Sequence, residues 1–96
     1  MERLILVLYD LSSPKALRQI PKILARFNSR RIQKSVYKAL VNEKEEIKLQ
    51  DLIVKYIDME IDKVLMIPLS ETEEKRAIHI GCQPVAIERS KEFLCI

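Results

Sequence analysis

One carboxylate stands apart in the first part of the chain. Asp10 is the only acidic residue between Arg3 and Val41, and it directly follows the apolar run Leu4–Tyr9. The end of a strand is a frequent position for a functional carboxylate. One carboxylate cannot form an all-protein metal cage, but Mg²⁺ commonly takes one or two and completes its shell with water and phosphate oxygens. Asp10 is therefore the candidate metal ligand and catalytic residue; the competing interpretation is an acidic turn or cap residue.

Two tyrosines are candidates to assist this carboxylate. Tyr9 immediately precedes Asp10, and Tyr37 lies in a second strand-like segment. A phenol can stack on a base or donate a hydrogen bond to a phosphate. Buried core tyrosines are the commoner case. We include both residues in the candidate catalytic site.

Basic residues point to a second function, the holding of a polyanion. Residues 1–41 carry a net charge of +7 and residues 42–96 a net charge of −4. Such segregation within one domain is typical of a nucleic-acid partner, although an uneven solvated surface is the simpler alternative. Contacts to phosphates would give affinity and salt dependence with little sequence preference. The candidate nucleic-acid-binding residues are Lys15, Arg18, Lys22, Arg30, Arg31 and Lys34.

The elements that must position these residues begin with a strand and a helix. The apolar block within Arg3–Asp10 predicts a strand covered on both faces. Next come cap hydroxyls and a proline suited to a first helical turn, in Leu11–Pro14. Pro21 should kink the helix that follows. The stripe expected to be buried comprises Leu17, Ile20, Leu24 and Phe27.

A second helix and further strands are predicted downstream. Asn42 and Glu45 have the spacing of a capping box that opens this helix. The strands predicted in this part of the chain are Arg31–Leu40, Asp62–Leu69 and Arg76–Ile80, with a polar turn at Glu71–Arg76 and short apolar pieces at Pro84–Ile87 and Phe93–Ile96. The second helix lies between the first two of these strands, and its expected buried stripe comprises Leu49, Leu52, Ile53, Tyr56 and Ile57.

The order of these elements is ambiguous at Arg31–Leu40, which is one strand or a strand with an extension. The two counts give βαβαββ and βαββαβ. Both predict a single domain, residues 1–96, with two helices on one face of a mostly antiparallel sheet, an α+β sandwich. Because Leu4–Tyr9 is apolar on both faces, we expect a homodimer whose sheets face each other. The C-terminal segment, about residues 92–96, would suit an added strand on the partner's sheet.

The composition excludes several classes of protein. No apolar run approaches the ~18 residues of a membrane span, and the N-terminus does not resemble a secretion signal. Cys82 and Cys95 form no C-x-x-C metal pair, and the single glycine excludes a Gly-rich phosphate loop. We therefore expect a cytoplasmic protein with reduced thiols.

Taken together, these segments resemble the CRISPR-associated Cas2 family. The resemblance rests on Tyr-Asp-Leu-Ser at residues 9–12, Lys-x-Leu-Arg at 15–18, Arg-Ile-Gln-Lys-Ser-Val-Tyr at 31–37, Asp-Lys-Val-Leu-Met-Ile-Pro-Leu at 62–69 and Ile-x-Ile-Gly at 78–81. It implies a ferredoxin-like fold and a homodimer with facing sheets. It also implies a role in CRISPR adaptation, the acquisition of spacers, in which the dimer bridges Cas1 integrase subunits and holds duplex DNA.

The same resemblance implies Mg²⁺-dependent endonuclease activity on RNA or DNA, with Asp10 binding the metal across the dimer. One position departs from the family pattern, because Lys38 stands where an acid often follows the Ser-Val-aromatic segment. Three functions stay open: a metal-dependent endonuclease, a non-catalytic adaptor that holds DNA, and a dimeric regulatory domain that binds a small ligand. The wide basic surface counts against the last.

Overall fold

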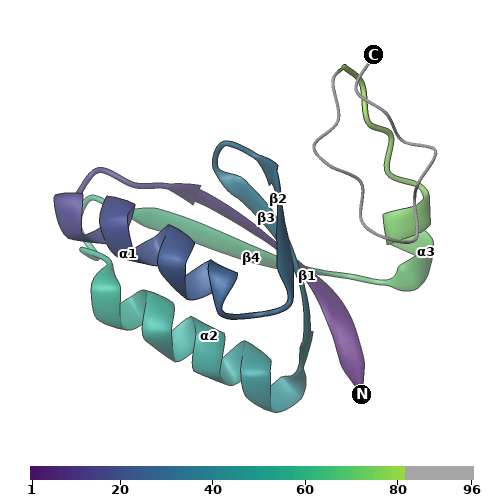
Figure 1. The fold of residues 1–96 in the computed structure, drawn as a ribbon, viewed down its shortest axis with the longest axis horizontal. Coiled ribbons are helices and arrows are strands. Elements are labelled where there is room, and N and C mark those ends of the chain that lie inside the picture. The colour runs from purple at the N-terminus through teal and green to yellow at the C-terminus, as the bar shows by residue number, and fades with distance from the viewer. Residues whose placement is uncertain (82–96) are drawn as a thin grey trace.

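The computed structural model describes residues 1–81. Its first six elements follow the order βαββαβ, which resolves the ambiguity left by the sequence. All strand pairs are antiparallel, and the strand order is β2-β3-β1-β4, the arrangement of a ferredoxin-like sandwich (Figure 1). The elements are β1 Glu2–Asp10, α1 Pro14–Ala25, β2 Ser29–Gln33, β3 Val36–Asn42, α2 Glu43–Tyr56, β4 Lys63–Leu69 and α3 Glu71–Lys75.

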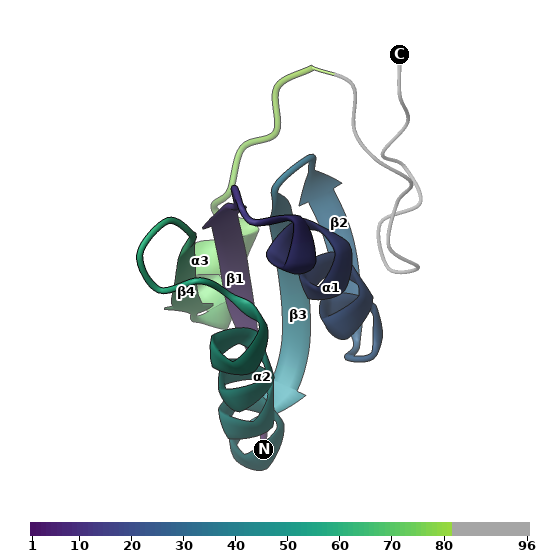
Figure 2. The same ribbon diagram turned by 90° about the vertical axis from the view of Figure 1, so that its left-hand side faces the viewer.

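The two long helices cover the same face of the sheet. Figure 2 shows α1 and α2 on one side of the strands and α3 on the other. Alternate residues of β1, Ile5 and Val7, point toward the long helices and are fully buried. Burial of one large aliphatic side chain contributes about 1.5–3 kcal/mol, so the layer between sheet and helices stabilises the fold strongly. The core residues are Ile5, Val7, Ala16, Ile20, Ile23, Leu24, Ala39, Val41, Leu49 and Ile53.

The first helix begins as the sequence predicts, and of its predicted stripe Ile20 and Leu24 are buried and Phe27 packs against the core. Ser13 is its N-cap, and the Ser13 hydroxyl accepts a hydrogen bond from the Ala16 amide at 3.2 Å. Pro21 lies inside the helix, which continues to Ala25. The inclusion of Leu17 in the buried stripe is wrong, because its side chain is 54% exposed. The helix faces the sheet with residues spaced 4, 3 and 1 apart, namely Ala16, Ile20, Ile23 and Leu24.

The second helix confirms both of its predicted features. The Glu45 amide donates to the Asn42 side chain at 2.8 Å, and the Asn42 amide donates to the Glu45 carboxylate at 2.9 Å. These two bonds form the predicted capping box. Leu49 and Ile53 are buried in the core, and the other members of the predicted stripe, Leu52, Tyr56 and Ile57, pack against it.

The predicted strand at Arg31–Leu40 is in fact parts of two strands. Lys34 and Ser35 form a turn, and Gln33 pairs with Val36 across it. No glycine or proline marks this turn in the sequence, so hydrophobic periodicity alone cannot detect it.

Two predictions after β4 are wrong. The expected polar turn is the short helix α3, opened by a capping box between Ser70 and Glu73. The segment Arg76–Ile80 is not a strand, and Ile78 and Ile80 are 84% and 93% exposed. Alternating apolar residues predict a strand, but a strand also needs a partner edge, and within residues 1–81 none pairs with this segment. The apolar pieces predicted at 84–87 and 93–96 lie outside the described residues.

The sheet face opposite α1 and α2 is mostly apolar, with Lys38 among its residues, and we name it the open face. Strand register aligns its side chains across three strands, with Leu6 of β1 between Lys38 of β3 and Ile67 of β4. Of the helices in residues 1–81, only α3 lies on this side (Figure 2). The apolar residues of the open face are Leu4, Leu6, Leu8, Val36, Leu40, Leu65, Ile67 and Leu69.

Among residues 1–81, no helix is long and apolar enough to cross a membrane.

Candidate functional site

Asp10 is the last residue of β1, and it is exposed. Because strand side chains alternate, Asp10 is on the same side of the sheet as Leu6 and Leu8. Its register partner on β4 is Lys63, which is also exposed. A charged carboxylate thus lies at the edge of the apolar open face, accessible to a ligand.

Among the described residues, the donor set is too small for an all-protein metal cage. Residues 1–81 contain no group of three or more His, Cys, Asp or Glu side chains that could hold an ion. Mg²⁺ commonly uses only one or two protein carboxylates, with water and substrate phosphate as its other ligands. The exposed Asp10 carboxylate is one ligand of this kind, so the residues of one chain fit a partial Mg²⁺ site that other oxygen ligands would complete.

Tyr9 and Tyr37 contact each other but lie on the opposite side of the sheet from Asp10. Their rings stack with centroids 6.2 Å apart, and the Tyr9 hydroxyl donates to the Lys34 carbonyl at 3.3 Å. Burial and the neighbouring Tyr37 raise the pKa of Tyr9, and the Arg31 guanidinium only partly opposes them. The Tyr9 hydroxyl is thus held as a hydrogen-bond donor to the Lys34 carbonyl.

Asp62 is a functional candidate that the sequence did not single out. It is 6% exposed, and its carboxylate accepts four hydrogen bonds: from the Ser12 and Ser13 amides, the Ser13 hydroxyl and the Asp58 amide. Burial alone would raise the pKa of Asp62, but these bonds outweigh burial and hold it well below its ordinary value. No local pattern in the sequence indicates these hydrogen bonds, because Ser12 and Asp62 are fifty positions apart and meet only in the folded chain.

The predicted basic residues of α1 form one exposed row. Lys15, Arg18 and Lys22 are spaced three and four residues apart, which places them on the same side of the helix. The Lys15 ammonium also lies 5.5 Å from the centre of the Tyr56 ring. This row, the α1 row, faces away from the sheet and is accessible to phosphates.

The predicted basic residues of β2 do not share one face. Arg30 pairs in register with Lys38 and Arg31 with Tyr37, so the two arginines point to opposite sides of the strand. The Arg31 guanidinium donates to the Lys34 carbonyl at 3.0 Å, which ties it to the β2–β3 turn. Lys34 is exposed in that turn. The three cations therefore do not form one surface of their own: Arg30 and Arg31 lie on opposite sides of β2, and Lys34 lies in the turn.

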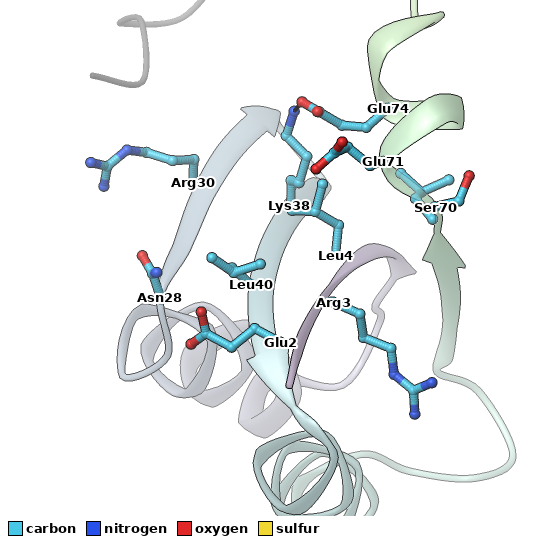
Figure 3. Close-up of a pocket in the computed structure, with 11 residues that line it drawn as sticks. Glu2, Arg3, Leu4, Asn28, Arg30, Lys38, Leu40, Ser70, Glu71 and Glu74 are labelled. Atoms are coloured by element: carbon cyan, nitrogen blue, oxygen red, sulfur yellow. Dashed lines mark hydrogen bonds and ion pairs between the residues drawn. The ribbon is translucent and has the colours of Figure 1, made fainter. Parts of the chain in front are cut away.

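Lys38, the departure from the family pattern, has a charged partner. Its ammonium is 3.1 Å from the Glu74 carboxylate, and the two side chains are 12% and 14% exposed. Figure 3 shows the two groups meeting between β3 and α3. A cavity of about 400 Å³ lies beside them, at the opposite end of β1 from Asp10, and Leu4, Leu40 and Leu69 are among its lining residues. The ion pair fixes α3 over this end of the open face.

Comparison with known proteins gives a family and a fold. The model of the family described as CRISPR associated protein Cas2 matches residues 2–77. Among curated proteins, no significant match is found. The structure is similar to that of a hypothetical protein from Thermus thermophilus, with a TM-score of 0.77 and 20% identity over 88% of this chain and 98% of that one. It is also similar to Streptococcus pyogenes Cas2, with a TM-score of 0.72 and 25% identity over 81% and 99% of the two chains.

Proposed function

The chain belongs to the CRISPR-associated Cas2 family, and on that premise we propose that it acts in CRISPR adaptation as a homodimer that holds duplex DNA and bridges Cas1 integrase subunits. We further propose that the dimer cleaves phosphodiester bonds with Mg²⁺. The observation that carries the proposal is the position of Asp10, exposed on the same side of the sheet as the apolar strip of β1.

The open face supports the dimer. Its apolar side chains are half-buried in one chain, except that Leu65 is 57% exposed. An apolar sheet face of this kind is stabilised when a second copy covers it. Packing of the two open faces around a two-fold axis would bring together residues at corresponding positions near that axis. Asp10 of each protomer would then contribute to one site.

The chain's own residues would divide the reaction between them. The two Asp10 carboxylates would hold the cation and orient the scissile phosphate, and the exposed Lys63 beside Asp10 would balance the charge of a phosphate oxygen. Bound Mg²⁺ would polarise that phosphate and lower the pKa of an attacking water. Tyr9 and Tyr37 would support this end of the sheet by packing and through the Tyr9–Lys34 hydrogen bond.

The α1 row supports the DNA-holding part of the proposal. Its three exposed cations, doubled in a dimer, suit contact with the phosphates of a duplex, and no base-reading motif accompanies them. The same surface would serve an adaptor that does not cleave. Duplex DNA is the proposed partner for this surface, and single-stranded RNA is the alternative.

A nuclease assay of the purified dimer tests the proposal. Wild-type protein should cleave RNA or DNA with Mg²⁺ and not with a chelator, and Asp10→Asn should lose this cleavage while keeping its dimer. Asp51→Asn is the matched control, because Asp51 is an exposed aspartate on α2. Duplex binding without any metal-dependent cleavage would leave the adaptor as the function and overturn the nuclease.

A further inference from the structure

Asp62 connects the two chain segments that surround Asp10. Its Oδ1 accepts from the Ser12 amide at 2.7 Å and the Ser13 amide at 3.0 Å, in the loop that begins just after Asp10. Its Oδ2 accepts from the Ser13 hydroxyl at 2.6 Å and the Asp58 amide at 2.7 Å. One carboxylate therefore joins the β1–α1 loop to the α2–β4 loop.

These bonds close the end of the β1–β4 ladder at which Asp10 lies. Ser12 is two residues after Asp10, and Asp62 directly precedes Lys63, the register partner of Asp10. Both strands are thus fixed immediately beyond their last paired residues. We propose that Asp62 is a positioning residue, which holds the end of β1 so that the Asp10 carboxylate has a fixed direction. This role rests on the proposed metal site and adds a residue to it.

Asp62 is not itself placed to bind the metal. Its two oxygens accept four donors, and its residue is 6% exposed, so its lone pairs are directed at the protein. Three of the donors are backbone amides, which cannot turn away. An asparagine in this position would keep the size of the side chain but would set an N–H₂ group against at least one backbone N–H. The substitution Asp62→Asn therefore loosens the loop without removing volume.

Three variants test the role: Asp62→Asn, Asp10→Asn and the control Glu45→Gln. Glu45 also accepts a backbone amide through a carboxylate, at 2.9 Å, but at the start of α2. The readouts are amide hydrogen exchange at Ser12 and Ser13, the carboxyl-carbon NMR signal of Asp10, and Mg²⁺ titration of the dimer. Asp62→Asn should speed that exchange by about tenfold or more, as removal of a hydrogen bond to a charged group implies. It should also shift the Asp10 signal and weaken Mg²⁺ binding. Glu45→Gln should do none of these.

An assay at excess Mg²⁺ distinguishes a misdirected Asp10 carboxylate in Asp62→Asn from a general loss of stability. Cleavage by Asp62→Asn should recover at high Mg²⁺, because Asp10 is still present, whereas Asp10→Asn should not recover. If Asp62→Asn does not fold, Ser13→Ala removes the hydroxyl donor alone and should change the same readouts less.

One possible result would overturn the positioning role, and another would overturn the proposed metal site. An Asp10 signal and Mg²⁺ affinity equal to wild type in folded Asp62→Asn would overturn the positioning role. A wild-type dimer that does not respond to Mg²⁺, while Asp62→Asn still shifts the metal-free Asp10 signal, would overturn the proposed metal site and support the positioning role.

Discussion

Two aspartates near the β1–α1 loop show how surroundings decide what a carboxylate can do. Asp10 is exposed and accessible to an external cation, whereas Asp62 is buried and directed at four protein donors. Their residue type is the same, and the sequence singled out only the first. Asp10 was detectable because it follows an apolar strand. Asp62 was not, because its partners are distant in the chain.

The pH dependence of stability follows from the lowered pKa of Asp62. Its ordinary pKa is 3.8, and the folded protein holds it well below that value. The stabilisation is therefore fully present above pH 3.8 and is lost as the pH falls toward the folded pKa. We expect wild type to have the higher Tm near neutral pH, and the gap to Asp62→Asn to shrink steadily below pH 4. Thermal melts from pH 7 to pH 2.5 measure this, and a constant gap would contradict it.

At the scale of elements, an ion pair between Lys38 and Glu74 joins α3 to the sheet. Both side chains are mostly buried, so reversal of either charge sets two like charges against each other where water screens them poorly. We expect Lys38→Glu and Glu74→Lys each to lower the free energy of unfolding by about 3–5 kcal/mol. The double exchange should recover much of that loss. Urea unfolding of all four proteins gives the coupling, and a double variant as unstable as the sum of the singles would show that the pair does not fix α3.

The α1 row is expected to bind phosphates without reading sequence. Arg18→Ala should weaken binding to unrelated duplexes by a similar factor and make the slope of log affinity against log salt shallower by about 0.9 for each phosphate that is no longer neutralised. The same substitution at Arg76, an exposed arginine after α3, is the control and should leave the slope unchanged. Fluorescence anisotropy across a salt series measures both. A hundredfold preference of wild type for one duplex would indicate base readout instead.

The features of the fold that have a local signature in the sequence were predicted correctly. The capping box of Asn42 and Glu45, the N-cap at Ser13 and the apolar β1 are all present in the structure. The turn at Lys34 and Ser35 was missed because it contains neither glycine nor proline. The prediction of a strand at Arg76–Ile80 was wrong because alternating apolar residues do not by themselves provide a neighbouring strand to pair with. The Lys38–Glu74 pair joins residues 36 positions apart and has no local signature.

At the scale of the whole molecule, we expect two copies of the chain to associate through their open faces. Leu65 is 57% exposed on that face, and Ile47 is 54% exposed on the outer side of α2. A lysine at position 65 would place a charge in the dimer interface, whereas a lysine at position 47 would remain in solvent. We expect Leu65→Lys to sediment as a monomer and Ile47→Lys as a dimer. A wild-type chain that sediments only at 11.3 kDa would exclude the dimer.

The central claim is that one metal site takes Asp10 from two protomers, and mixed dimers test it most directly. Wild-type and Asp10→Asn chains are co-refolded at known ratios, and Mg²⁺-dependent cleavage is measured at constant total protein. If both carboxylates are needed, activity follows the square of the wild-type fraction, so an equal mixture retains about one quarter of it. Activity that falls in direct proportion to the wild-type fraction, with half remaining in the equal mixture, would contradict the shared site.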